Sequence, residues 1–466
     1  MRKLLLICTL VLIYTGTEAK IWTPSVIADN MVLQQNDTVT LWGWTTKTNE
    51  EITVTGDWNN VPVKTKAFRG KWKVNLPTTK AGGPYKVKIK GHKELLLSNV
   101  MLGEVWLASG QSNMQWSSVH GFDNAKEEVS LADYPNIRLF NVPQVQSATR
   151  QFDVPAEWEE CAPESVKEFS AVAYFFARHL HKNLDVPIGI INSSWGGTNA
   201  EVWVEEKVVN EDPELKQALT CHTPNDWKSY EPAYMFNSMI APLIPFTIAG
   251  TIWYQGESNR NSASTYTKLF TSLIDNWRDN WGYNFPFYYV QIAPFKYKEK
   301  DAGVLLREAQ LKAIKHDNVG MVVVSDIGNI NDIHPGNKQD VGKRLGNWAL
   351  VKTYNHSGIA YSGPLYKQME TKKNKAIISF DYAESGLMMK GKKLTHFEIA
   401  GADQQFVKAK AKISGNKVIV SSKQVKQPVA VRFAWDNIAE PNLFNKEGLP
   451  ASAFRTDDWE IKITDQ

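Results

Sequence analysis

The pattern of apolar and polar residues changes twice along the chain and divides it into three regions. In residues 20–97, apolar and polar residues alternate, or nearly alternate, in short runs separated by turn-forming residues. A period of two is typical of strands that bury one face and expose the other. This region therefore predicts an N-terminal β-rich module of the sandwich type, with strands at 38–44, 51–55 and 85–90.

In the middle region, residues 98–355, the apolar runs are almost continuous. Such strands are typical of a parallel sheet that is covered on both faces. Between them, apolar residues recur at helical spacing and predict helices with one buried face. Alternating strands and helices favour a three-layer α/β domain. The expected strands are 105–108, 188–191, 248–253, 287–290 and 321–324, and the expected helices are 165–181, 265–281, 305–316 and 339–352.

The two ends of the chain carry further signals. From residue 356 to 466 the strand pattern returns and predicts a second β-rich module, or the other half of the first. Residues 1–19 combine a basic start, an apolar run from Leu4 to Tyr14 and the small-residue site before Lys20. This arrangement predicts a cleaved export signal, because the run is too short to span a bilayer. We therefore expect a soluble protein in the periplasm or outside the cell, without a membrane span.

Composition narrows the class of protein. The 466 residues are 43% hydrophobic and 22% charged, which excludes a disordered, collagenous or coiled-coil chain. The net charge of +4 gives no basic excess for nucleic-acid binding. Three cysteines exclude a disulfide scaffold, and no carboxylate–histidine cluster has metal-ligand spacing. Cys8 lies in the signal, whereas Cys161 and Cys221 could form a bridge or remain free.

Residues suited to acyl transfer follow four of the predicted parallel strands. Ligands bind at the carboxyl ends of the strands in an open parallel sheet, so these segments should converge. A serine needs an imidazole to take its proton, and glycines or a side-chain amide can supply N–H donors to an oxyanion. The segments are Gly110-Gln111-Ser112-Asn113-Met114, Ser194-Trp195-Gly196-Gly197-Thr198, Gln255-Gly256-Glu257-Ser258-Asn259 and Asp332-Ile333-His334-Pro335.

Each segment alone also fits an ordinary turn or helix start. The first is not the nucleophile motif of α/β-hydrolases, because Met114 stands where that motif needs a second glycine. At four ends of one sheet, however, the combination favours a catalytic site.

Together the segments resemble the four blocks of the SGNH hydrolase superfamily, in its branch of sialate O-acetylesterases and related carbohydrate acetylesterases. The resemblance extends from about residue 33 to 455 and implies a flavodoxin-like three-layer domain flanked by β-modules. It implies that Ser112 is the nucleophile and His334 the general base. It also implies an oxyanion hole formed by the backbone N–H groups of Ser112 and of Gly196 or Gly197, with the side chain of Gln255.

The residue that orients His334 is open at this point. In many SGNH enzymes an acid lies three positions before the histidine, where this chain has Asn331. Asp332 is the nearest carboxylate and the preferred candidate; Asp326 and a backbone carbonyl are alternatives. Any acceptor at the second ring nitrogen could serve.

The resemblance implies an O-acetylated carbohydrate as the substrate, first of all a sialate 9-O-acetyl ester, and no cofactor. Acetylated xylan or another polysaccharide is an alternative, as are a lipase or peptidase and a silent carbohydrate-binding protein. Sugars pack on aromatic rings, and 17 tryptophans are compatible with such contacts, although most should fill the core. We expect substrate contacts from Gln111, Trp116, Trp195 and Glu257. Arg307 and Glu308 could also reach the pocket, but a salt-bridged surface is preferred for them.

Overall fold

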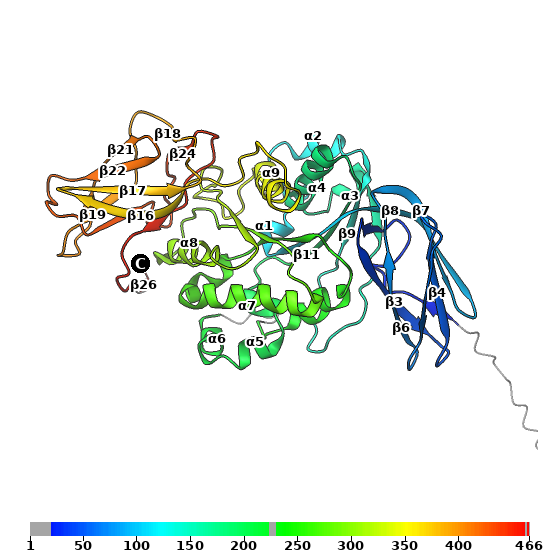
Figure 1. Cartoon of the computed structure of the whole chain (residues 1–466). Helices are drawn as coiled ribbons and strands as arrows, with labels where there is room; N and C mark the ends of the chain where they lie inside the picture. The colour runs from blue at the N-terminus through cyan, green and yellow to red at the C-terminus, as the bar shows by residue number, and fades with distance from the viewer. Residues whose placement is uncertain (1–19, 223–229, 462–463, 466) are drawn as a thin grey trace, which may run out of the picture.

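A large mixed sheet forms the centre of the molecule (Figure 1). The computed structural model describes residues 20–222, 230–461 and 464–465. The central strands are β8 (Glu94–Gly110), β9 (Tyr134–Asn141), β10 (Trp158–Cys161), β11 (Ile188–Ser194), β12 (Gly250–Tyr254), β13 (Phe287–Val290) and β15 (Val319–Val322). All except β10 run parallel, in the order β9-β11-β8-β12-β13-β15. The neighbours of β8 on its two sides come from different parts of the chain, so a crevice is expected beyond its carboxyl end.

Helices cover both faces of this sheet. They are α4 (Ala171–Leu184) and α9 (Lys338–Trp348) on one face, and α7 (Ala263–Trp281) and α8 (Ala302–Ala313) on the other. Alternate side chains of β8 point to opposite faces: Trp106 belongs to the apolar cluster of α4 and α9, whereas Leu107 belongs to that of α7 and α8. The mixed α/β fold predicted for the middle region is confirmed.

The predicted helix at 165–181 begins later than the apolar spacing indicates. Ser170 lies at the N-cap of α4, where its Oγ accepts the backbone N–H of Ala173 at 3.1 Å. Phe169 is buried as expected but precedes this cap. The spacing therefore identified the buried residues correctly and misplaced the start of the helix, because capping and not apolarity fixes that start.

The N-terminal region is joined to the central sheet through β8 itself. Its strands are β1 (Ile21–Trp22), β2 (Val32–Gln34), β3 (Thr38–Thr45), β4 (Glu51–Gly56), β5 (Pro62–Lys66), β6 (Lys71–Pro77) and β7 (Gly82–Lys90). The first part of β8 pairs with β7, and its second part lies between β11 and β12. The predicted boundary at residues 97 and 98 therefore falls inside one continuous strand.

The C-terminal region forms a separate apolar core on the other side of the central sheet (Figure 1). One antiparallel sheet has the order β16-β17-β22-β21, and a second has the order β20-β19-β23-β25. Buried side chains from both sheets, such as Ile378 and Phe433, belong to the same cluster. The bounds are β16 (Leu365–Lys372), β17 (Lys375–Asp381), β19 (Phe397–Ala400), β20 (Val407–Lys408), β21 (Lys410–Ser414), β22 (Lys417–Ser421), β23 (Ala430–Phe433) and β25 (Phe454–Arg455).

Two further sequence predictions bear on export and redox state. The expected signal at 1–19, with Cys8, lies outside the described residues. Cys161 is buried, Cys221 is exposed, and both are free thiols. Within the described part of the chain, no helix has both the length and the apolar character needed to cross a bilayer.

Candidate active site

Ser112 lies directly beyond the carboxyl end of β8. Gly110 ends the strand with φ +135°, and a Cβ atom at this position would lie 2.2 Å from the carbonyl oxygen of Tyr254. Only glycine allows this close approach between the ends of β8 and β12. Ser112 then begins the short helix α1 (Ser112–Gln115), so its backbone N–H has no carbonyl partner within that helix.

The loop after β15 brings His334 to this serine. The Nε2 atom of His334 lies 2.9 Å from Ser112 Oγ, within hydrogen-bond distance. Burial lowers the pKa of His334, and the positive charge of Lys338 lowers it further. The imidazole is therefore neutral at neutral pH, as a group that accepts a proton must be. The structure thus brings together the serine and the histidine that the sequence predicted to act as a pair.

Asp332 faces the other nitrogen of His334 without bonding to it. Its Oδ1 lies 3.9 Å from His334 Nδ1 and accepts the backbone N–H of His334 at 2.9 Å. Asp326, the alternative acid, instead forms a two-pronged ion pair with Arg344 at 2.7 and 2.8 Å. Among the described residues, Asp332 is therefore the acid placed to orient this imidazole, and that role stays a prediction.

Gly196 packs against the nucleophile. A Cβ atom on Gly196 would lie 3.1 Å from Ser112 Cβ and 2.9 Å from Gln115 Oε1. Its backbone N–H donates to Gln115 Oε1 at 2.6 Å. Gly197 follows with φ +68°, in the left-handed region that favours glycine. Glycine at position 196 thus lets the backbone pack closely on Ser112, while its N–H is bound to a side-chain oxygen. The role of the glycine pair in an oxyanion hole stays a prediction.

Gln255 is buried, and its amide is fully engaged within the fold. The Nε2 group donates to the carbonyl of Thr198 at 3.1 Å and to Asn259 Oδ1 at 2.8 Å. The Oε1 atom accepts the hydroxyl of Tyr266 at 2.9 Å. In this arrangement Gln255 ties the third segment to the second, and its predicted role as an oxyanion donor would require one of these bonds to be exchanged.

A buried polar network beside the Ser–His pair escaped the sequence analysis. Asn113 donates to Glu257 Oε1 at 2.7 Å and to the carbonyl of Ile333 at 2.9 Å, and its Oδ1 accepts Lys338 Nζ at 2.6 Å. Burial lowers the pKa of Lys338 to about 7 and raises that of Glu257. Asn113, which follows the nucleophile, is therefore bonded to Ile333, which precedes the base. The available signals were the position of Asn113 directly after Ser112 and that of Lys338 four residues after His334.

Three residues predicted to contact substrate have contacts within the protein. The ring of Trp116 stacks on His334 with centroids 3.9 Å apart and planes 16° apart, and its Nε1–H donates to the carbonyl of Gly121. Gln111 Oε1 accepts the backbone N–H groups of Gly256 and Ser258 at 3.2 and 3.3 Å. Trp195 is half-buried against the apolar core. Glu257, the fourth, belongs to the buried network. Contact of these four residues with substrate stays a prediction.

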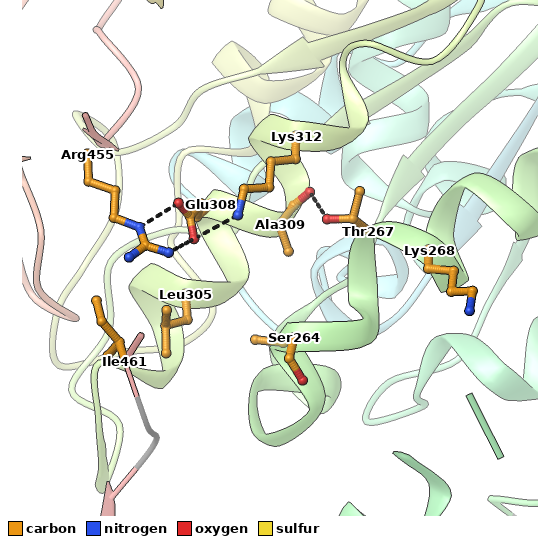
Figure 2. Close-up of a pocket in the computed structure, with 10 residues that line it drawn as sticks. Ser264, Thr267, Lys268, Leu305, Glu308, Ala309, Lys312, Arg455 and Ile461 are labelled. Atoms are coloured by element: carbon orange, nitrogen blue, oxygen red, sulfur yellow. Dashed lines mark hydrogen bonds and ion pairs between the residues drawn. The ribbon is translucent and has the colours of Figure 1, made fainter. Parts of the chain in front are cut away.

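Glu308 lines a different cavity. This hollow of about 740 Å³ lies between α7 and α8, and none of the residues expected to act in catalysis or to contact substrate lines it (Figure 2). Glu308 pairs there with Arg455 at 2.8 Å and with Lys312 at 3.2 Å, as expected for a salt-bridged residue. The same expectation is wrong for Arg307, which is buried and donates to the backbone carbonyl of Asp436. The C-terminal region supplies this partner, which the sequence could not reveal.

Known proteins resemble this chain over most of its length. A family model described as "Carbohydrate esterase, sialic acid-specific acetylesterase" matches residues 102–350. The sialate O-acetylesterase of Homo sapiens is 31% identical over 398 residues, covering 77% of this chain and 76% of that protein. That of Pongo abelii is 29% identical over 456 residues, covering 88% and 87%. The crystal structure of a carbohydrate acetylesterase from Xanthomonas citri is 39% identical, has a TM-score of 0.86, and covers 94% of this chain and 100% of that one.

Proposed function

Because this chain belongs to the family of sialic acid-specific carbohydrate acetylesterases and is a carboxylic ester hydrolase for O-acetylated carbohydrates, we propose that Ser112 is its nucleophile and His334 its general base. The observation that carries this proposal is the 2.9 Å separation of Ser112 Oγ and His334 Nε2 beyond the carboxyl end of β8. The resemblance first drawn from the four motifs agrees with this family.

The reaction begins when Ser112 Oγ attacks the carbonyl carbon of the acetyl group while His334 Nε2 takes the hydroxyl proton. The ester C–O bond then breaks, His334 returns the proton to the departing sugar oxygen, and an acetyl group stays on Ser112. A water molecule attacks this acetyl group with His334 again as the base. Acetate leaves, and Ser112 recovers its proton.

The negative charge of each tetrahedral intermediate needs donors close to Ser112. The backbone N–H groups of Ser112 and Gly196 are the donors that the geometry supports best. Gly196 would exchange Gln115 Oε1 for the substrate oxygen, so the side chain of Gln115 moves aside when the acetyl group enters. Gln255 joins the oxyanion hole only if its amide gives up its bond to Thr198 or to Asn259. Gly197 supports the backbone turn that follows Gly196.

Asp332 orients His334 in this proposal. Hydrogen bonds in a site without substrate are often long and tighten in the reacting complex. A shift of roughly 1 Å would bring Asp332 Oδ1 within hydrogen-bond distance of Nδ1 and fix the tautomer that leaves Nε2 free.

For the substrate, we propose an O-acetylated sialic acid, with the 9-O-acetyl ester first, acted on by an exported enzyme. The names of the mammalian relatives support sialate. The more similar protein from Xanthomonas citri is described only as a carbohydrate acetylesterase, which keeps acetylated polysaccharides such as xylan as the second candidate.

The test is acetate release by the wild type and by Ser112→Ala, from O-acetylated sialic acid and acetylated xylan in parallel. Release by the wild type alone supports the serine mechanism, and the ratio of the two rates identifies the sugar. Equal release by both proteins would contradict the role of Ser112. No release from either substrate would favour another acetylated glycan or a binding protein.

A further inference from the structure

A groove lined by aromatic rings lies where the N-terminal region meets the central sheet, close to the amino end of β12 (Figure 1). Ser112, in contrast, lies beyond the carboxyl end of β8. The groove has a volume of about 470 Å³ and lies between β3 and β6 of the N-terminal region, residues 150–152, and residues 241–245 before β12. Trp42, Trp44, Trp72, Phe68 and Phe152 contribute its rings. We call it the aromatic groove.

Two of these rings, Trp42 and Trp44, lie where the strand pattern calls for polar residues. Along β3, Val39 and Leu41 are buried, whereas Trp42 and Trp44 point to the partly exposed face. One face of an antiparallel sheet at a surface is normally polar. Here Trp44 is paired across the sheet with Trp22, and the two rings stack with centroids 6.0 Å apart. The partly exposed face of this sheet therefore carries adjacent rings at Trp42 and Trp44.

Two phenylalanines extend this surface into solvent. Phe68 is 68% exposed and Phe152 is 63% exposed, from segments far apart in the chain. Single exposed apolar residues are common, but a contiguous patch in a hollow usually marks a binding surface. Trp44, Phe68 and Phe152 all line the same groove, so the exposure is concentrated at one place.

The charged residues that line the groove are all positive. Lys71, Lys73 and Arg150 line it, and no carboxylate does. Lys71 Nζ lies 4.8 Å from the centre of the Phe152 ring. Arg150 is 3.7 Å from Glu205, whereas neither lysine forms an ion pair with a carboxylate in the described part of the chain. An anionic group entering the groove would therefore meet uncompensated ammonium groups.

We propose that the aromatic groove binds a carboxylate-bearing glycan chain, away from the site of hydrolysis. The C–H faces of sugar rings can pack on Phe68, Phe152 and Trp44, while Lys71 and Lys73 attract sugar carboxylates. An acidic glycan fits the two features of the groove, its exposed rings and its lysines. It also belongs to the same chemical class as the enzyme's carbohydrate substrates. Sialic acids and uronic acids share this chemistry.

The positions of the groove and of Ser112 indicate what such binding does. The part of β8 in the parallel sheet, residues 104–110, spans roughly 20 Å at about 3.3 Å per residue. A long glycan held in the groove would raise the local concentration of its acetyl esters at Ser112, whereas a small ester would gain nothing. The groove should therefore affect action on polymers and leave action on small esters unchanged.

The test compares two double variants, Phe68→Ala with Phe152→Ala and Lys71→Ala with Lys73→Ala, with the wild type. Matched controls are Leu131→Ala, whose side chain is 63% exposed like that of Phe152, and Lys423→Ala in the C-terminal region. Titration calorimetry measures binding of an α2,8-linked sialic acid hexamer, an oligogalacturonate and a neutral xylo-oligosaccharide. Hydrolysis of p-nitrophenyl acetate monitors the catalytic site independently.

We expect each double variant to weaken binding of an acidic glycan by about tenfold, because several ring or charge contacts are lost. Both controls should bind as the wild type does, and all should hydrolyse p-nitrophenyl acetate equally. The tighter of the two acidic probes identifies the sugar. Unchanged affinity in the double variants, or equal binding of the neutral probe, would overturn the proposal. So would a dimer that Phe152→Ala converts to monomers, since the groove would then be an interface between copies of the chain.

Discussion

The parallel strands of the central sheet have a carboxyl end and an amino end, called here the carboxyl edge and the amino edge. The surfaces at these two edges differ in polarity and burial. At the carboxyl edge, polar side chains such as Asn113, Glu257 and Lys338 are buried and bonded to one another beside Ser112. At the amino edge, aromatic rings such as Phe152 are exposed beside lysines. Buried polar groups cost free energy unless they are bonded, and exposed rings forgo hydrophobic stabilisation. The carboxyl edge thus compensates its buried polar groups with hydrogen bonds, whereas the amino edge leaves apolar rings in contact with water.

The difference shows what kind of function each edge can carry. At the carboxyl edge Gly196 packs so closely on Ser112 that an added Cβ atom would lie 3.1 Å from Ser112 Cβ, so substitutions there should lower kcat. The amino edge offers exposed rings together with two lysines that have no carboxylate partner in the described part of the chain, so its substitutions should change affinity for long glycans. The variants below separate these two effects.

Ser112→Ala should have the largest effect and act on one edge only. Without the nucleophile, kcat on a small acetyl ester should fall by roughly 10⁴ or more. Binding of the sialic acid hexamer at the aromatic groove should not change, because Ser112 lies at the opposite edge. Stopped assays of acetate release measure kcat, and calorimetry on the same preparation measures binding of the hexamer. A loss below tenfold would contradict the role of Ser112.

Asp332→Asn tests whether the 3.9 Å gap to His334 closes during the reaction. If Asp332 orients the imidazole, kcat should fall by at least about tenfold and at most roughly 10⁴, the loss seen when a true triad acid is replaced. Steady-state kinetics on a small acetyl ester are the measurement, with Asp326→Asn as the comparison for a nearby buried ion pair. A loss below tenfold would leave a backbone carbonyl or water as the partner of Nδ1.

Gly196→Ala should lower kcat by roughly 10², the scale of losing one oxyanion donor. The added methyl group would lie 3.1 Å from Ser112 Cβ, so either the serine or the Gly196 backbone must shift. KM should change little, because the sugar is not bound by this glycine. Steady-state kinetics together with the thermal unfolding midpoint separate a local shift at the site from a loss of folding. A variant with the same kcat as the wild type would exclude Gly196 from the oxyanion hole.

The sequence predicted that Ser112 and His334 lie together at the carboxyl edge, because strand ends and motif residues coincide there. Ser112 and His334 follow predicted strands, and their meeting needs only the parallel order of the sheet. Asn113 and Lys338 were missed because their importance arises from contacts across more than 200 positions of the chain. Gln255 was recognised by type, but its bonds to Thr198 and Asn259 depend on packing that no spacing encodes.

The amino edge was harder to predict from the same chain. Alternation located β3 but gave no sign that Trp42 and Trp44 lie on its outer face, since tryptophan is the expected core residue. The change from alternating to continuous apolar residues near position 97 reflects increasing burial along β8 and not a break in the strand. Tertiary contact, which brings the loop with Phe152 beside β6, completes the groove.

The smallest effect that we predict is a pair of opposite shifts in the pH profile. The charge of Lys338 lowers the pKa of His334, and that of Asp332 raises it. In the wild type the acid limb of kcat/KM should lie below the ordinary histidine value of 6.5, where Lys338, with a pKa of about 7, is charged. Lys338→Met should therefore move the acid limb of kcat/KM to higher pH, and Asp332→Asn to lower pH, each by less than about one unit.

Profiles of kcat/KM from about pH 4 to about pH 9 give the pH of each inflection independently of the absolute rates. Lys423→Met should leave the limb in place. Shifts in the same direction for both variants would mean that the limb belongs to a group other than His334.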